Sequence, residues 1–223
     1  MFLIEKISNN LAFKVSSALK LNKDKQEIIA YGAFNFIQTI WCIFMVMFLG
    51  IIFNVALKAV FISFIISILR KYSGGAHSSS PNRCAIIGAI VSVGLALFVN
   101  YIYDLASLKW IVIMQVIVFL FAYHNIYKYA PVDSSAKPIK KEEFKQRMKK
   151  RSIITLNVLI VITIILLITY FMLGIKYYLS IATCICLGIL WQVLTLTPKC
   201  QLVLLNIDDF FKKITNILGE GKQ

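Results

Sequence analysis

The fold is decided by residues 153–175, which read IITLNVLIVITIILLITYFMLGI and contain no charged side chain. A helix needs about 20 apolar residues to cross the roughly 30 Å of a bilayer core, and this stretch is long enough. Three further stretches of similar length are predominantly apolar, namely Ala85 to Tyr103, Trp110 to Tyr127 and Tyr177 to Leu196. The sequence therefore predicts an all-helical integral membrane protein.

The composition of the whole chain excludes a water-soluble protein. Of its 223 residues, 59% are hydrophobic and 15% are charged, whereas soluble domains carry about a quarter charged residues. Disorder is excluded by the same numbers, because long tracts of Ile, Leu, Val and Phe would not stay solvated without a core or a bilayer. The five cysteines are an odd count and lie mostly in apolar runs, so no disulfide framework is implied.

Residues 28–69 contain a single charge, Lys58, and would be far too long for one spanning helix. We expect a hairpin there that turns near Gly50 to Asn54, which brings the expected number of spans to about six. Residues 1–27 place apolar side chains near helical spacing, so they are expected to form an amphipathic helix on the inner membrane surface or a plain basic lead-in. The whole chain, 1–223, is expected to be one domain.

Topology explains the net charge of +14. Most of the Lys and Arg side chains, 21 of 24, fall in four segments: the N-terminal arm 1–27, the loop 70–84, the loop 128–152 and the tail 197–223. Positive charges collect in the cytoplasmic connections of membrane proteins. We therefore expect both termini and both long loops to be cytoplasmic.

The loop at residues 70–84 reads RKYSGGAHSSSPNRC and contains His77 and Cys84. A cysteine thiolate is a strong nucleophile, and a nearby histidine can take its proton and later protonate a leaving group. On a straight helix these two residues would be separated by about 10.5 Å of rise, so the chain must fold back to bring them together. The pair Gly74 and Gly75 favours such a turn, as does the sequence Ser80-Pro81-Asn82. The alternative is a plain connector with a solvated histidine.

Cationic side chains surround this candidate pair. Arg70, Lys71 and Arg83 would favour a thiolate and could hold a peptide carboxylate or carbonyl. Backbone N–H groups around Cys84 or the side chain of Arg70 could supply an oxyanion hole, and the sequence does not separate them. A third, orienting group could come from any of four residues, which are Asp133, Gln192, Asn35 and Gln38.

No metal or cofactor is expected. Zinc needs three or four ligands, and the chain has two histidines and neither a CxxC nor a HExxH motif. The second histidine, His124, is expected to be a packing residue at the end of a span.

The motif Gly-Gly-Ala-His, followed by Cys84 and preceded by Arg70-Lys71-Tyr72, resembles the accessory gene regulator B (AgrB-like) family of bacterial quorum-sensing membrane peptidases. Other parts of the chain are similar to the same family. They are Tyr129 to Asp133, Lys137 to Ile139 and Gly188 to Pro198, so the resemblance extends from about Arg70 to Pro198.

The resemblance implies a cysteine endopeptidase, without a cofactor and acting as a homodimer, that processes a short amphipathic precursor peptide at the inner face of the cell membrane. Cys84 would attack the scissile carbonyl and His77 would act as general base and then as acid, with Arg70, Gly74 and Gly75 in support. In the family, an internal Cys or Ser of the precursor then attacks the thioester and closes a thiolactone or lactone ring.

Basic surfaces outside the catalytic loop are candidates for recruiting an acidic precursor tail. They include Lys140 and Lys141, although topology already explains these charges.

Two other functions are weighed against the peptidase. A small peptide transporter would show polar residues along several spans and often internal symmetry, and neither is evident. A noncatalytic membrane scaffold would tolerate the loss of the Cys84 thiol, so alanine at this position distinguishes both alternatives from the peptidase.

Overall fold

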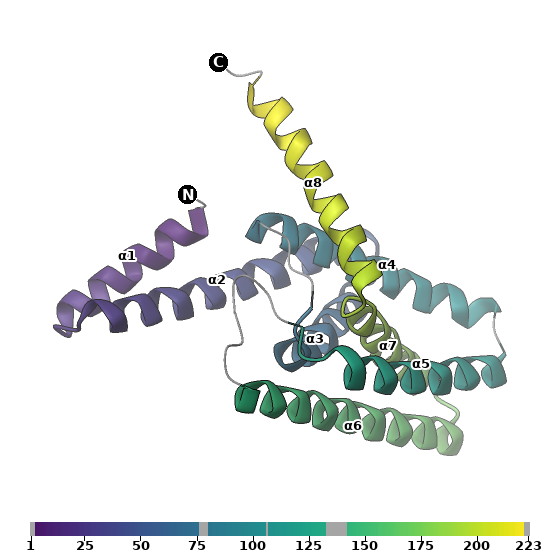
Figure 1. The fold of residues 1–223 in the computed structure, drawn as a ribbon. Coiled ribbons are helices and arrows are strands. Elements are labelled where there is room, and N and C mark those ends of the chain that lie inside the picture. The colour runs from purple at the N-terminus through teal and green to yellow at the C-terminus, as the bar shows by residue number, and fades with distance from the viewer. Residues whose placement is uncertain (1–2, 76–79, 106, 133–141, 221–223) are drawn as a thin grey trace. The chain divides into compact units, whose positions relative to one another are not determined.

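The computed structural model describes residues 3–75, 80–105, 107–132 and 142–220. Within these ranges the chain forms eight helices and no strand, which confirms the all-helical prediction (Figure 1). The helices are α1 (Leu3–Ala18), α2 (Lys23–Ile52), α3 (Ala56–Ser73), α4 (Pro81–Leu105), α5 (Leu108–Tyr129), α6 (Glu142–Leu173), α7 (Lys176–Leu194) and α8 (Pro198–Glu220).

Five of these helices, α2, α4, α5, α6 and α7, are long and apolar enough to cross a membrane. The expected hairpin in residues 28–69 is present, because α2 ends at Ile52 and the N–H of Val55 donates to the carbonyl of Gly50 at 2.8 Å just before α3 begins. The expected number of about six spans includes the second half of this hairpin, which is α3. Three of the 18 residues of α3 are cationic, however: Lys58, Arg70 and Lys71. Length and composition therefore identify five spans among the described residues instead of six.

Helix α6 begins well before the expected span, at Glu142. Its polar first part, EEFKQRMKKRS, consists mostly of residues with high helix propensity, and Glu142 and Glu143 lie in its first turn, where negative charge stabilises a helix. The helix therefore continues from the basic loop into the apolar stretch without a break.

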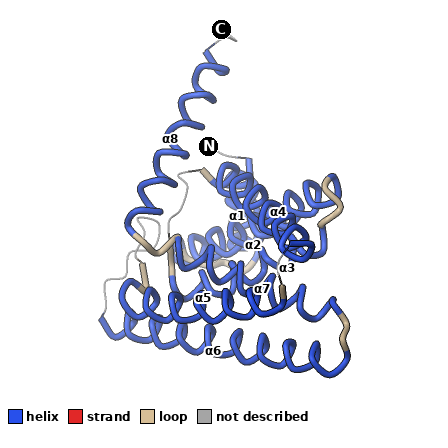
Figure 2. Tube along the Cα trace, turned by 90° about the vertical axis from the view of Figure 1, so that its right-hand side faces the viewer, coloured by secondary structure: helices blue, strands red, loops and turns tan. Residues whose placement is uncertain are grey.

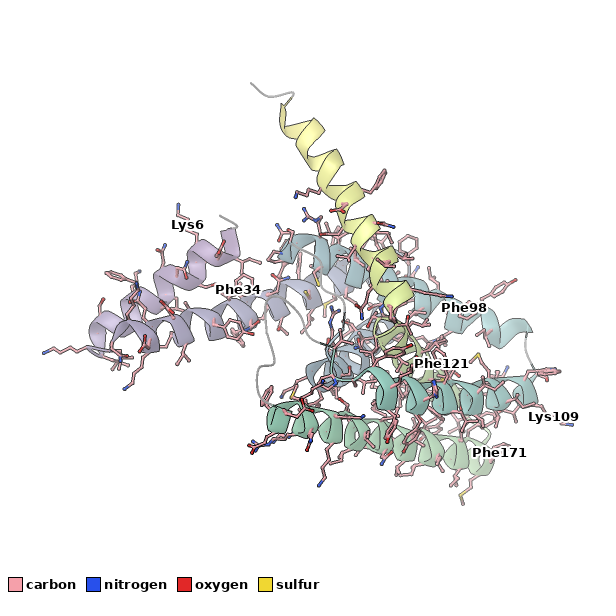
Figure 3. All side chains as sticks on the ribbon, in the orientation of Figure 1. Lys6, Phe34, Phe98, Lys109, Phe121 and Phe171 are labelled. Carbon is pink, nitrogen blue, oxygen red and sulfur yellow. The ribbon has the colours of Figure 1, made fainter. Side chains whose placement is uncertain are left out.

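The chain divides into two compact units, Met1–Met45 and Val46–Gln223. The first unit contains α1, which is the helix expected in residues 1–27. Its buried residues follow a four-residue spacing at Ile4, Ser8, Ala12 and Ser16, while Lys6 is exposed on another face (Figure 3). A position of α1 on the membrane surface stays a prediction, as does the single-domain organisation.

The second unit is built around α7, which contacts α3, α4, α5 and α6. Twelve of the 19 residues of α7 are buried, and Figure 2 shows α7 beside α5 and α6. A Cβ atom at Gly188 would lie 3.0 Å from the Cγ2 atom of Ile65, so this glycine lets α3 approach α7 closely.

The outer helices of the second unit expose large apolar side chains. Phe98 of α4 and Phe171 of α6 are 46% and 65% exposed (Figure 3), and many Ile, Leu and Val residues on the same helices are exposed as well. A soluble monomer does not expose apolar surface on this scale. The arrangement is that of a multi-pass membrane protein whose outer surface is covered by lipid.

Candidate active site at the end of the helix bundle

Cys84 lies in the first turn of α4, which begins at Pro81, four residues before the span start expected at Ala85. Pro81 opens the helix, a position that proline tolerates well because its missing N–H would have no partner there. The backbone N–H of Cys84 donates to the carbonyl of Ser80 at 3.0 Å. Its side chain is half-buried. The first turn of a helix stabilises negative charge, which suits a cysteine that reacts as a thiolate.

The other described cysteines of the second unit have less suitable surroundings. Cys184 and Cys186 are fully buried inside α7. Burial raises the pKa of the Cys200 thiol at the start of α8, which disfavours its thiolate.

Three chain segments meet where α3 ends. The N–H of Val132, which follows α5, donates to the carbonyl of Ser73 at 2.9 Å, and Gly74 and Val132 form an isolated parallel bridge. The third segment is the end of α7. We call this set the junction: residues 73–75, 131–132 and 192–196.

Gln192 connects α7 to the other segments of the junction. Its side chain is fully buried, and its Nε2 atom donates to the Oγ atom of Ser73 at 3.0 Å and to the carbonyl of Gly74 at 2.8 Å. The carbonyl of Gln192 itself accepts the hydroxyl of Thr195 at 2.7 Å. Both donor positions of the amide are therefore used on the segment that leads into the loop of His77.

Gly74 and Gly75 are required by the geometry of the junction. Gly74 has φ +70°, and a Cβ atom there would lie 2.1 Å from the carbonyl oxygen of Val132. Gly75 has φ +134°, and its Cβ atom would lie 2.9 Å from the Oγ1 atom of Thr195 and 3.3 Å from the Nε2 atom of Gln192. A side chain at either position would be strained by the backbone and would also push the segments apart.

An ion pair holds the start of α4. The Nε atom of Arg83 lies 2.7 Å from the Oδ1 atom of Asp208 in α8, and the two side chains are 16% and 5% exposed. The sequence suggested Arg83 as a substrate contact, whereas in the structure this guanidinium pairs within the protein. Sequence reasoning missed Asp208, although two adjacent acids, Asp208 and Asp209, in a basic tail are a visible signal.

Reversing one charge of this pair is expected to destabilise the protein. Arg83→Asp would leave two carboxylates facing each other in a mostly buried place, and breaking such a pair costs about 3–5 kcal/mol. Thermal unfolding of the purified protein measures the loss. The double variant Arg83→Asp with Asp208→Arg should recover at least half of it, and Asp209→Arg, at the exposed neighbouring position, should have little effect. A double variant no more stable than Arg83→Asp alone would contradict the pairing.

The other residues suggested by the sequence are placed as follows. Arg70 lies in the last turn of α3, where its carbonyl accepts the N–H of Gly74 at 3.0 Å. Lys71 is exposed, with its Nζ atom 5.5 Å from the ring centroid of Tyr72. Four residues lie outside the described residues, namely His77, Asp133, Lys140 and Lys141.

Of the candidates for a third, orienting group, Gln192 is placed against the start of the loop. Asn35 and Gln38 hydrogen-bond within α2, to the carbonyl of Tyr31 at 2.9 Å and to the Sγ atom of Cys42 at 3.5 Å. Sequence reasoning missed Ser73 and Thr195, whose hydroxyls join the same network; only the polar character of the sequences YSGG and TLTP indicated them.

Fold and site together define a multi-pass helical membrane protein with a polar junction and a cysteine-bearing helix start in its second unit. The chain belongs to the accessory gene regulator B family, whose model matches residues 4–196. The resemblance noted in the sequence is thereby confirmed. Family membership implies that the protein takes part in processing a quorum-sensing peptide.

Individual relatives match more than half of the chain. Two proteins of Clostridium perfringens named AgrB-like, from strains SM101 and 13, are 40% and 39% identical over 213 residues, which is 95% of this chain and 100% of each relative. An AgrB-like protein of Listeria monocytogenes strain HCC23 is 32% identical over 130 residues, 58% of this chain and 56% of the relative. No solved structure matches the chain.

Proposed function

We propose that the protein is a cysteine endopeptidase that removes the C-terminal part of a short autoinducing-peptide precursor at the cytoplasmic face of the bacterial cell membrane. The observation that carries the proposal is the half-buried Cys84 in the first turn of α4, in a chain of the accessory gene regulator B family. The cytoplasmic placement rests on the distribution of Lys and Arg, most of which lie in the termini and the two long loops.

In the first step, His77 takes the proton of the Cys84 thiol, and the thiolate attacks the scissile carbonyl carbon of the precursor. The carbon–sulfur bond forms and the peptide carbon–nitrogen bond breaks, while the imidazolium gives its proton to the departing amine. The C-terminal part of the precursor leaves with a new amino terminus. The N-terminal part stays on Cys84 as a thioester.

In the second step, a nucleophile within the bound peptide replaces Cys84. An internal thiol or hydroxyl of the precursor loses its proton to His77 and attacks the thioester, which forms a thiolactone or lactone and returns the Cys84 thiolate. A thioester keeps much of the activation of the original acyl group, so no further energy source is needed. Exclusion of water among the helices would favour this ring closure over hydrolysis.

Partners under this proposal are the precursor peptide, the membrane lipids and a second copy of the chain in a homodimer. Exposed cationic side chains at the start of α6, such as Lys145, Arg147 and Lys150, add to the positive surface that an acidic precursor tail would meet. Lys140 and Lys141 immediately precede this helix in the sequence.

The acyl-enzyme is the species that tests the proposal. We expect the purified protein in lipid nanodiscs, incubated with short candidate precursors encoded near its gene, to gain the mass of the N-terminal peptide fragment. Hydroxylamine should remove this mass because it cleaves thioesters. Intact mass spectrometry measures both, and the adduct mass identifies the cleavage position.

Cys84→Ala is the decisive comparison in the same experiment. It should be inserted in the membrane and give neither adduct nor cleaved tail. Cys200→Ala is the matched control and should form the adduct normally. A cleaved tail produced by Cys84→Ala would reject this nucleophile, and the absence of cleavage with every precursor would favour a noncatalytic membrane scaffold.

A further inference from the structure

We propose that Gln192 is the positioning residue of the active site, and that its side-chain amide fixes the end of α3 and the residues Gly74 and Gly75, from which the reactive loop, residues 70–84, continues towards His77 in the sequence. This inference rests on the proposed function and deepens it, since it names the residue that sets the geometry of the reacting pair. The sequence left four candidates for an orienting group without a choice among them.

The two hydrogen bonds donated by Nε2 of Gln192 are the first observation. They go to Ser73 and Gly74, the last residue of α3 and the first residue after it. The Oγ atom of Ser73 in turn donates to the carbonyl of Leu69 at 2.9 Å. The amide therefore bonds both the side chain and the backbone at the point where the chain leaves the helix.

The close fit of Gly75 against α7 is the second observation. A Cβ atom on this residue would lie within 3.3 Å of both Thr195 and Gln192, so the backbone of Gly75 rests directly on the end of α7. Gly75 is buried, and it precedes His77 by two residues.

The third observation concerns the Oε1 atom of Gln192, which is the acceptor of the side-chain amide. It is buried, and no described residue donates a hydrogen bond to it. A buried amide oxygen without a donor costs free energy, so such atoms in native proteins call for an explanation. An acceptor beside the start of a loop that carries a histidine is suited to an N–H group of that loop or of the bound peptide.

The described residues on both sides of positions 76–79 are thus held by contacts with other helices. Gln192 holds the side that follows α3, and the ion pair of Arg83 with Asp208 holds the side that opens α4. Catalytic geometry is sensitive to such supports, because a misplacement of about 1 Å can cost about a hundredfold in rate. Gln192 acts through the loop and need not touch the substrate.

The test compares three variants of the full chain in nanodiscs, with His77→Ala as the reference for loss of the imidazole. Gln192→Met has a similar volume and no hydrogen bonds, whereas Gln192→Glu keeps the acceptor oxygen and replaces the amide donor by a second acceptor. Gln115→Met is the matched control, because Gln115 is another fully buried glutamine of the bundle and contacts Thr183 of α7, away from the junction. Replacing it carries a similar packing cost without disturbing the loop.

The first readout is the alkylation of Cys84 by iodoacetamide, located by peptide mass. The rate near neutral pH reports a thiolate assisted by the imidazole, whereas at about pH 9.5 an ordinary thiol ionises without help. A change in the access of iodoacetamide to Cys84 alters both rates equally, so it does not change their ratio. We expect this ratio to fall about ten- to hundredfold in Gln192→Met and Gln192→Glu, as in His77→Ala, and to be unchanged in Gln115→Met.

The second readout is a single turnover with the precursor. A positioning role lowers the rate constant of acyl-enzyme formation at an unchanged final amount of adduct, whereas a merely structural role lowers the amount. The inference is overturned if the ratio and the rate constant of Gln192→Met equal those of the wild type. It is equally overturned if Gln192→Glu keeps the wild-type ratio or if Gln115→Met loses as much as Gln192→Met.

Failure of the inference and failure of the proposed function give different results. Alkylation needs no precursor, so a ratio that depends on Gln192 and His77 without any peptide adduct would reject the peptidase and keep the positioning role. Adducts that form at the wild-type rate in Gln192→Met would keep the peptidase and reject the role of Gln192.

Discussion

Replacement of His77 by alanine is expected to lower the rate of acyl-enzyme formation by about a hundred- to ten-thousandfold, because general acid–base catalysis contributes a factor of this size. Without the imidazole, the Cys84 thiol has no positioned general base and the departing amine has no positioned proton donor. The deficit should shrink as the pH rises, since the thiol then loses its proton to water. Single-turnover mass spectrometry over a range of pH values measures the loss and its pH dependence.

The second histidine of the chain is the control for this prediction. His124 is exposed near the end of α5, so His124→Ala changes the same residue type outside the junction and should react at the wild-type rate. Two results would contradict the assignment: a His77→Ala variant that reacts at full rate at neutral pH, or a His124→Ala variant that loses as much.

The spans could be predicted from the sequence because a bilayer imposes a length and a composition on each segment separately. Residues 153–173 and most or all of each of the three other apolar stretches form helices. The same reasoning wrongly predicted α3 as a span. Its core-facing residues, such as Ile62 and Leu69, are apolar, but cationic residues lie near both of its ends. It also placed the start of α6 too late, because hydropathy does not register a polar helix that continues into an apolar one.

The contacts of the junction could not be predicted in this way, because they join residues that are far apart in the chain. Gly74 and Gly75 were predictable as turn formers, but the reason why no side chain fits, the carbonyl of Val132 and the hydroxyl of Thr195, depends on how α3, α5 and α7 pack. The partner of Arg83 is 125 residues away in the sequence. A single sequence carries no periodic signal for such pairs, so Gln192 stood among four candidates until its contacts were known.

Gly74→Ala is expected to reduce the rate of acyl-enzyme formation by about a hundredfold or more while the protein still inserts into the membrane. The added Cβ atom would lie 2.1 Å from the carbonyl oxygen of Val132, so the segment after α5 and the end of α3 must separate. That movement breaks the bond from Val132 to Ser73 and displaces the backbone that Gln192 holds. A shift of about 1 Å at a reacting group is enough for a loss of this size.

Gly174→Ala separates this clash from simple backbone strain. Gly174, in the connection between α6 and α7, has φ +68°, almost the same as Gly74, but a Cβ atom there meets nothing within 4 Å. Its alanine variant should therefore be strained by the positive φ and still keep its acylation rate. A Gly174→Ala variant that loses as much activity as Gly74→Ala would show that a positive φ, and not the contact with Val132, makes this glycine necessary.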